Sequence, residues 1–314
     1  MANKKEPAWD KFMRETLQFV IRGKNIPSPV SDLKSVVDLL KPESTKKEPI
    51  KQGYVSEIDD VLEEINSAYA PTNEFNLDLD KCIILPGKKH ENYRYEDLVV
   101  SMHKLGYSRS IENIANYYGF EVHFPSKESN ECNYIGGVEC GNFLLLNSAL
   151  GNMTLNLRQL FDLKNLLTEG VFFKKKIYNG KGDQIFQYIL KDIYSEIFLK
   201  RNPLRGEFID NAYSSNINGS LIYSSNHRLE NGALIPQRIG IVEKYLKEPC
   251  FIDSESCTSA GLPIKEGWDL YYIPPVNDSV SCIIANENTV IIDCSVPRKT
   301  KDYAIGIRPA KVRK

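Results

Sequence analysis

Histidine and cysteine are the side chains most often used for acid–base, nucleophilic and zinc chemistry, and this chain of 314 residues holds four histidines and seven cysteines. The cysteines are Cys82, Cys132, Cys140, Cys250, Cys257, Cys282 and Cys294. No two of them have the C-x-x-C spacing that is typical of zinc and redox pairs. The odd number and scattered spacing predict reduced, mostly buried thiols, no metal site and no cofactor. Cys282 and Cys294 fall in neighbouring predicted strands, where they could face each other unbridged.

His227 is the histidine best placed for acid–base work, because Glu207 and Asp210 precede it in the same turn-rich stretch. Nothing in the sequence fixes the geometry of these three side chains. Cys140 would act as a nucleophile only with a histidine beside it. We therefore predict no catalytic residue, and an enzyme with an unrecognised site near His227 remains an alternative.

The first part of the chain predicts short helices joined by polar linkers. Trp9, Phe12, Met13, Leu17 and Val20 recur at helical spacing, and Lys41 to Gln52 reads as a solvated linker. Helices this short are unstable alone in water. We therefore expect residues 1–78 to dock on a partner, on a second copy or on the rest of this chain.

The middle of the chain, residues 79–204, predicts a mixture of helices and strands. Apolar periodicity and glycine stops indicate helices over 95–105, 110–118 and 156–168, and a buried strand over 141–147. The clearest helix is expected from Asp183, as N-cap, to about Lys200.

From residue 205 onward the apolar residues alternate and turn dipeptides punctuate the chain. Asn218-Gly219 and Asn231-Gly232 predict two hairpins, because both residues tolerate positive φ. A short helix over 239–246 and strands over 268–273, 280–285, 290–295 and 304–312 are expected to follow. The order of elements predicts an α+β fold: N-terminal helical segments at 1–78, a mixed region at 79–204 and a C-terminal antiparallel β-rich domain at 205–314.

Charge and hydropathy narrow the classes of partner. The net charge of −1 argues against a general nucleic-acid binder. The helices at 95–105 and 110–118 nevertheless resemble a helix-turn-helix in outline, so a nucleic-acid-associated regulator using a helical hairpin at 95–118 is a second alternative. No segment is long and apolar enough for a membrane span, and the run from Leu17 to Ile21 is too short for a signal peptide. These features predict a cytoplasmic protein with no membrane partner.

Residues 231–314 carry a more specific pattern. The stretch from Gly232 to Arg238 (GALIPQR) is followed by Glu243, an aromatic strand, two hairpin strands and the ending IRPAKVR at 307–313. This order resembles C-type-lectin-like domains of the formylglycine-generating-enzyme-like and phage variable-protein type. Gln237 stands where those domains have serine or threonine, and Tyr272 where tryptophan is usual. The cysteine arrangement of the formylglycine-generating enzymes has no counterpart here.

The resemblance implies a rigid scaffold that displays side chains for binding. The residues in the matching segment with suitable chemistry are Tyr271, Tyr272, Asn277, Asn286 and Asn288. We therefore predict a non-enzymatic ligand-binding or structural protein that recognises a protein or a glycan through its C-terminal domain. A phage origin would place it in the virion.

Overall fold

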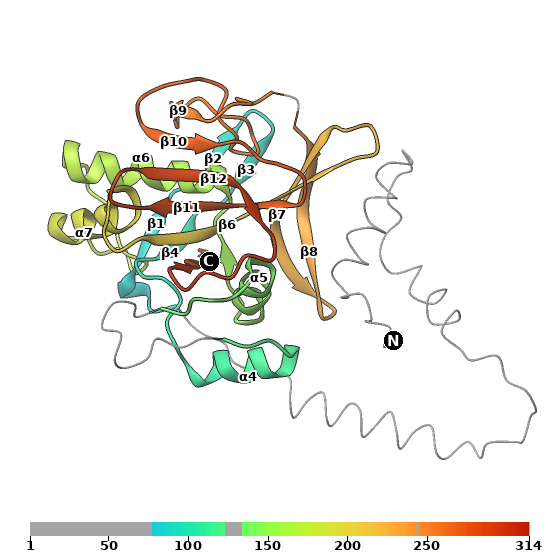
Figure 1. Cartoon of the computed structure of the whole chain (residues 1–314). Helices are drawn as coiled ribbons and strands as arrows, with labels where there is room; N and C mark the ends of the chain where they lie inside the picture. Colours follow the sequence, from blue (N-terminus) through green and yellow to red (C-terminus); the bar gives the residue numbers. More distant parts are fainter. Residues whose placement is uncertain (1–76, 123–133, 243, 314) are drawn as a thin grey trace, which may run out of the picture. The chain divides into compact units, whose positions relative to one another are not determined.

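The structure is a computed structural model that describes residues 77–122, 134–242 and 244–313 (Figure 1). The chain divides into two units, Met1–Thr72 and Asn73–Lys314, and the described residues belong to the second. The helical segments predicted for residues 1–76 lie outside the described residues. No helix among those described is long and apolar enough to cross a membrane.

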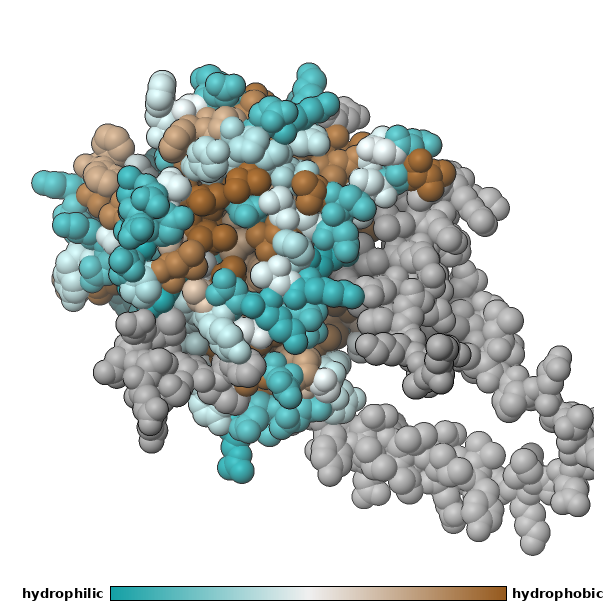
Figure 2. Space-filling model, in the orientation of Figure 1, coloured by the Kyte–Doolittle hydropathy of each residue, from teal (hydrophilic) through white to brown (hydrophobic). Residues whose placement is uncertain are grey.

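The larger sheet has eight strands in the order β8-β7-β6-β11-β12-β10-β9, with β13 paired to β6. The strands are β6 (Arg205–Ser215), β7 (Leu221–Glu230), β8 (Ala233–Ile241), β9 (Cys250–Ile252), β10 (Leu270–Ile273), β11 (Ser279–Ala285), β12 (Val290–Pro297) and β13 (Ile305–Gly306). Both predicted Asn-Gly hairpins are confirmed. Gly219 and Gly232 each have a φ of 76°, which a glycine adopts without strain. On the face in Figure 2, apolar surface gathers over β11 and β12 within a hydrophilic surround.

A second sheet has four strands in the order β1-β4-β14-β5. They are β1 (Cys82–Leu85), β4 (Leu98–Ser101), β5 (Met153–Thr154) and β14 (Pro309–Val312); the short η1 helix (Leu79–Lys81) precedes β1, and β2 (Lys88–His90) and β3 (Tyr93–Tyr95) form a separate hairpin. The last strand of the chain, β14, pairs with both β4 and β5. The regions predicted as 79–204 and 205–314 therefore share this sheet.

The described helices are α4 (Arg109–Tyr118), α5 (Cys140–Ala149), α6 (Leu157–Phe173) and α7 (Gln187–Phe198). Asn156 caps α6 through a reciprocal capping box with Gln159, so the helix predicted at 156–168 is confirmed and extends to Phe173. Figure 1 shows α6 and α7 side by side. Together with the sheets, these helices confirm a mixed α+β fold.

The helix predicted from Asp183 begins later, at Gln187. The backbone of Asn179 pairs with that of Asp183, and Ile185 donates its backbone N–H to the carbonyl of Ile177. This tight turn, with Gly182 at a φ of 95°, keeps residues 177–185 in a short hairpin in place of the first turn of the predicted helix. The helix does bury an apolar face, because Leu190, Ile193 and Ile197 are buried.

Two secondary-structure predictions are wrong for a shared reason. The apolar run at 141–147 is the helix α5, and the helix expected at 95–105 is replaced by the end of β3, then β4. A short, continuously apolar segment fits a buried helix or a buried strand equally well, and tertiary packing decides. Because β4 lies between β1 and β14, its Val99 and Val100 are buried in a sheet. The helical hairpin proposed at 95–118 therefore does not form, and α4 stands without its expected partner.

The C-terminal strands also differ from a simple meander. β10 pairs with β12 in parallel, β13 pairs with β6 in parallel, and residues 239–241, expected to be helical, extend β8. Cys282 lies opposite Asp293, whereas the thiol of Cys294 accepts a 3.2 Å hydrogen bond from Ser281. One step of register thus turns Cys282 and Cys294 to opposite faces of the sheet. All six cysteines in the described residues are free thiols.

Candidate functional site

The two tyrosines predicted to bind a ligand sit on β10 and have different surroundings. Tyr272 is 0% exposed and belongs to the hydrophobic core. Tyr271 is half-buried, with its ring edge-on to Phe251 at a centroid distance of 5.3 Å. A side chain sealed in the core has no surface to offer a ligand, so Tyr272 cannot serve as a contact.

The three predicted asparagines lie at opposite ends of β11. Asn277 precedes the strand and accepts a 2.7 Å hydrogen bond from the backbone N–H of Ser215. Asn286 follows it and accepts from the backbone N–H groups of Asn288 and Thr289. The seven residues of β11 span about 23 Å at 3.3 Å per residue. Asn277 therefore does not converge with Asn286 and Asn288, and ligand binding by this set stays a prediction.

His227, the histidine considered for acid–base work, forms a buried pair with Asp210. Its Nδ1 contacts one carboxylate oxygen of Asp210, and its backbone N–H donates to the other at 2.7 Å. Both side chains are almost fully buried, so a substrate in solvent does not reach them. Cys140 is also buried, and burial raises the pKa of its thiol well above the ordinary value. The site considered around His227 is a structural pair in the core.

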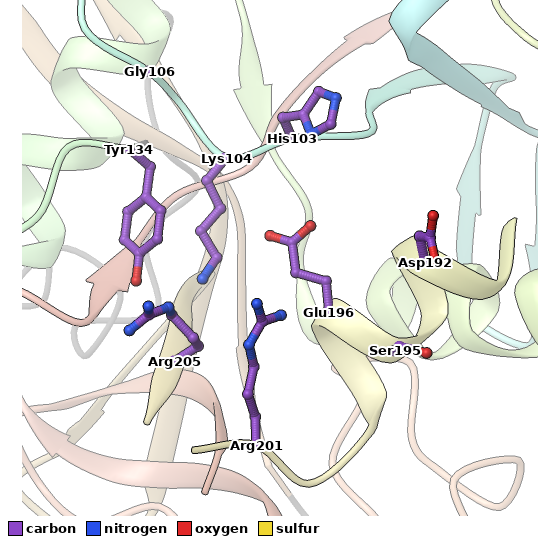
Figure 3. A pocket seen from close by; sticks show the side chains of 9 residues that line it. All are labelled: His103, Lys104, Gly106, Tyr134, Asp192, Ser195, Glu196, Arg201 and Arg205. Carbon is purple, nitrogen blue, oxygen red and sulfur yellow. The ribbon is translucent and has the colours of Figure 1, made fainter. Parts of the chain in front are cut away.

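A cleft of about 740 Å³ opens elsewhere, between the loop that follows β4, the C-terminal half of α7 and the start of β6 (Figure 3). Its lining residues are His103, Lys104, Gly106, Tyr134, Asp192, Ser195, Glu196, Arg201 and Arg205. The volume falls in the range usual for small-molecule sites. None of these residues was predicted to bind a ligand.

Backbone hydrogen bonds hold the wall of the cleft in place. Leu105 donates its N–H to the carbonyl of Ile307 at 2.8 Å, and Ile135 donates to the carbonyl of Leu105 at 2.9 Å. The hydroxyl of Tyr134 donates to the carbonyl of Ala304 at 2.6 Å. Three segments far apart in the sequence therefore meet at Leu105, the chain neighbour of Lys104.

Lys104 is a buried cation at the cleft. It is 7% exposed, and its Nζ lies 4.2 Å from the centroid of the Tyr134 ring. Within the described ranges, no carboxylate forms an ion pair with Lys104 at 4.0 Å or less. Burial lowers the pKa of Lys104, and the positive charges of Arg308 and Arg205 act in the same direction against the opposing pull of Glu207 and Glu196.

Two arginines add positive charge at the same place. Arg205, at the start of β6, is buried and donates from its Nη1 to the carbonyl of Leu204 at 3.0 Å. Arg201 is exposed. In Figure 3 the amine of Lys104 lies between the two guanidinium groups, with that of Arg205 on the side of the Tyr134 hydroxyl. Guanidinium groups suit this position because their planar N–H donors match carboxylate and phosphate oxygens.

The carboxylates at the cleft do not cancel this charge. Asp192 and Glu196 both come from α7, and an oxygen of Glu196 lies 3.5 Å from Nη2 of Arg308. Arg308 also makes a two-point contact with Glu207, at 3.0 and 2.6 Å. Arg308, which does not line the cleft, therefore partly neutralises the negative charge of Glu196. The lining thus carries three cationic side chains, Lys104, Arg201 and Arg205, against the two carboxylates.

Gly306 leaves room for the two side chains that form the back of the cleft. A Cβ at this position would lie 2.8 Å from the ring of Tyr134 and 3.2 Å from Cδ of Lys104. We expect Gly306→Ala to lower the free energy of unfolding by about 1–3 kcal/mol, because the side chains must shift to accept the methyl group. Urea unfolding measures this. The control Gly141→Ala, whose Cβ meets nothing within 4 Å, should cost nothing; equal stability of the two variants would contradict the packing described.

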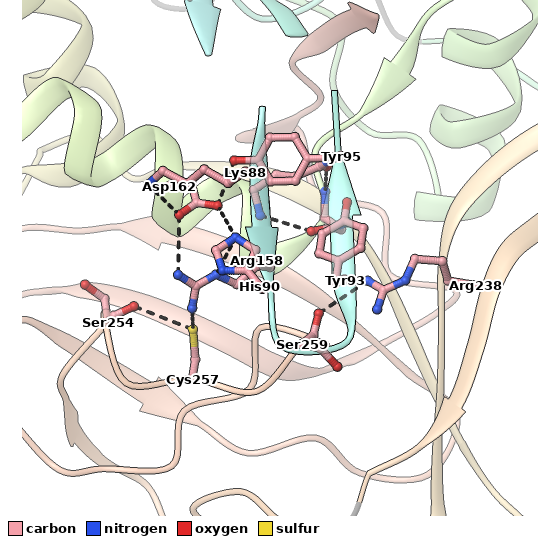
Figure 4. A network of polar contacts seen from close by, with 12 residues as sticks. Lys88, His90, Tyr93, Tyr95, Arg158, Asp162, Arg238, Ser254, Cys257 and Ser259 are labelled. Atoms are coloured by element: carbon pink, nitrogen blue, oxygen red, sulfur yellow. Dashed lines mark hydrogen bonds and ion pairs between the residues drawn. The ribbon is translucent and has the colours of Figure 1, made fainter. Parts of the chain in front are cut away.

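A second polar cluster surrounds Asp162 on α6 (Figure 4). Its buried carboxylate accepts from Tyr95 at 2.7 Å, from Lys88 at 3.0 Å and from Arg158 at 3.3 Å, and lies 2.8 Å from Nε2 of His90. Arg158 also contacts the thiol of Cys257, whose pKa burial raises to about 11. A thiol in that state is a poor nucleophile. The cluster ties the β2–β3 hairpin to α6, and we assign it a structural role.

Comparison with protein families, curated proteins and solved structures finds no match to this chain. In the part of the chain that the structure describes, no group of three or more histidine, cysteine, aspartate or glutamate side chains is arranged to hold a metal ion. The function is therefore argued from the chemistry of the cleft.

Proposed function

We propose that this protein binds the anionic group of a small molecule in the cleft lined by Lys104, Arg201 and Arg205. The observation that carries the proposal is the ammonium group of Lys104, buried at the cleft with no carboxylate of the described residues in ion-pair range. Burying this charge costs several kcal/mol, and the attraction of Glu207 and Glu196 offsets that cost only in part, because the pKa of Lys104 is still lowered. An anion that enters the cleft recovers part of that cost, and this recovery contributes to its binding free energy.

The shape of the site favours a small molecule over a macromolecule. The cleft encloses about 740 Å³ and draws on residues from separate segments, as ligand sites commonly do. Arg201 stands at the exposed side and Lys104 at the buried side. A carboxylate or phosphate can therefore meet donors on two sides at once, with Tyr134 as the aromatic wall.

The proposal keeps the predicted class, a ligand-binding protein, and places the site elsewhere. The predicted recognition of a protein or glycan by residues 231–314 rests on their resemblance to C-type-lectin-like domains and stays a prediction. The cleft does not depend on that resemblance, because it draws mostly on residues 103–205.

Phosphate titration tests the proposal. Inorganic phosphate should raise the thermal unfolding temperature of the wild-type protein, since a ligand that binds only the native state stabilises it. Lys104→Met should weaken phosphate binding about tenfold or more, because a charge-assisted contact is lost. Without phosphate the same variant should stay close to wild type in stability, because the substitution removes a desolvated charge together with its attraction to Glu207.

A matched control is Lys176→Met, which removes an exposed lysine outside the cleft. It should retain the phosphate response in full. Calorimetry gives the affinities directly. An absent response in wild type, or an equal affinity in Lys104→Met, would overturn the proposal.

A further inference from the structure

We infer that Lys104 forms a reversible Schiff base with the carbonyl carbon of an anionic aldehyde or oxo acid held in this cleft. The inference rests on the proposed anion site and adds the chemical class of its ligand. Its basis is a buried amine that faces the cleft together with two guanidinium groups and a carboxyl group (Figure 3).

The first requirement is an amine that is often neutral, because only the unprotonated form attacks a carbonyl group. Desolvation and neighbouring cations are the two means by which proteins produce such lysines. At Lys104, which is 7% exposed, burial is the main cause of a lowered pKa; Arg308 and Arg205 act in the same direction, and Glu207 and Glu196 oppose them. A larger fraction of Lys104 is therefore neutral near pH 7 than of an ordinary surface lysine.

The other buried lysine of the described residues is differently placed. Lys164 has its Nζ 2.6 Å from a carboxylate oxygen of Asp269 and 3.4 Å from the hydroxyl of Ser254. Lys164 thus provides an internal comparison, with similar burial and an ion-pair partner that Lys104 lacks among the described residues.

The second requirement is a fixed position for the electrophile. Arg201 and Arg205 are the groups suited to hold a carboxylate or phosphate, and in Figure 3 their guanidinium groups lie on either side of the amine of Lys104. A carbonyl group attached to that anion is then held near the amine. Holding the reactants together removes much of the entropic barrier to attack.

The third requirement is a route for protons. The amine lone pair attacks the carbonyl carbon, the C=O π bond breaks, and a proton passes from nitrogen to oxygen to give a carbinolamine. A proton donor then protonates the hydroxyl, which leaves as water while the nitrogen lone pair forms the C=N bond of an iminium ion. Loss of the N–H proton to the donor's conjugate base gives the neutral imine and restores the donor. Glu196, whose carboxyl group faces the same cleft, is the group placed to relay this proton. One water is released, and no oxidant or reductant is needed.

Reductive trapping tests the inference. The full-length protein is incubated with pyridoxal 5′-phosphate, an aldehyde that carries a phosphate, and the imine is reduced with sodium borohydride. Peptide mass spectrometry then locates the modified lysines. Lys104 should be labelled at least about tenfold faster than Lys164 and the exposed Lys176, and Arg201→Gln should slow labelling of Lys104 by about tenfold. Inorganic phosphate should protect Lys104 and leave Lys176 unprotected.

The outcomes separate this inference from the proposed function. If phosphate binds in a Lys104-dependent way but Lys104 is not labelled, the Schiff base is overturned and the anion site stands. If phosphate neither binds nor protects, the anion site is overturned as well. If pyridoxal without its phosphate labels Lys104 equally well, the anion does not direct the reaction, and the inference is again overturned.

Discussion

Replacement of Glu207 by glutamine is expected to lower the free energy of unfolding by about 3–5 kcal/mol, because it leaves Arg308 buried without its main counterion. Arg308 is 3% exposed, and Glu207 holds it through two hydrogen bonds at 2.6 and 3.0 Å. The remaining carboxylate, Glu196, lies farther away at 3.5 Å. Urea unfolding monitored by circular dichroism measures the loss.

The large expected loss of stability follows from the position of the Glu207–Arg308 pair in the fold. Glu207 belongs to β6 of the larger sheet, whereas Arg308 directly precedes β14 of the smaller one and donates to the carbonyl of Ser101 at the end of β4. The pair therefore joins the two sheets. Burial alone would raise the pKa of Glu207, but the attraction of Arg308 and Lys104 outweighs it and holds that pKa below its ordinary value. Glu207 is thus ionised at neutral pH.

A double-mutant cycle provides the control for this prediction. Glu207→Leu alone and Arg308→Met alone should each be strongly destabilising, because each leaves the other residue as a buried charge without its main partner. The double variant, Glu207→Leu with Arg308→Met, should recover much of the loss, because an apolar pair replaces the ions without leaving either charge uncompensated. If the two single effects add without recovery, the residues do not act as a coupled pair.

Local signals in the sequence predicted the elements that depend on local chemistry. The two Asn-Gly turns gave their hairpins because positive φ at glycine is a property of the dipeptide itself. The amphipathic pattern at 156–168 predicted α6, and in the structure a capping box at Asn156 closes within four residues at the start of that helix. Where a segment was uniformly apolar, as at 141–147, the choice between helix and strand lay in its neighbours.

The candidate cleft could not be predicted in this way. Its residues come from three stretches of chain, 103–106, 134 and 192–205, that no spacing rule connects. Lysines are common on protein surfaces, so Lys104 becomes distinctive only when the fold buries it. Similarly, Glu207 and Arg308 are 101 residues apart, and their pairing is set by β6 and β14. A sequence pattern indicates the local backbone geometry. The cleft, by contrast, forms only when distant segments fold together and bury Lys104.

Like Glu207, Asp162 is a buried carboxylate that contacts basic side chains. We therefore expect Asp162→Asn to lower the free energy of unfolding by about 3–5 kcal/mol near pH 7. Asparagine keeps the shape of the side chain but cannot neutralise Lys88 and Arg158, which contact the carboxylate now. It also removes the charged acceptor of the Tyr95 hydroxyl. Asp183→Asn, at an exposed position, is the matched control and should change stability by less than about 0.5 kcal/mol.

The pH dependence distinguishes a lost charge from a lost contact at Asp162. Burial alone would raise the pKa of this carboxyl, but the hydrogen bonds from Tyr95 and Lys88 and the charge of Arg158 outweigh it, so the pKa lies below its ordinary value of 3.8. As the pH falls, Asp162 therefore takes up its proton first in the unfolded chain. The stabilisation that its carboxylate gives above pH 3.8 is lost as the pH falls through the lower pKa of the folded state. The stability difference between wild type and Asp162→Asn should thus be largest near neutral pH and shrink below about pH 4. A difference that stays constant from pH 7 to pH 3 would show that the carboxylate charge does not stabilise the joint between the β2–β3 hairpin and α6.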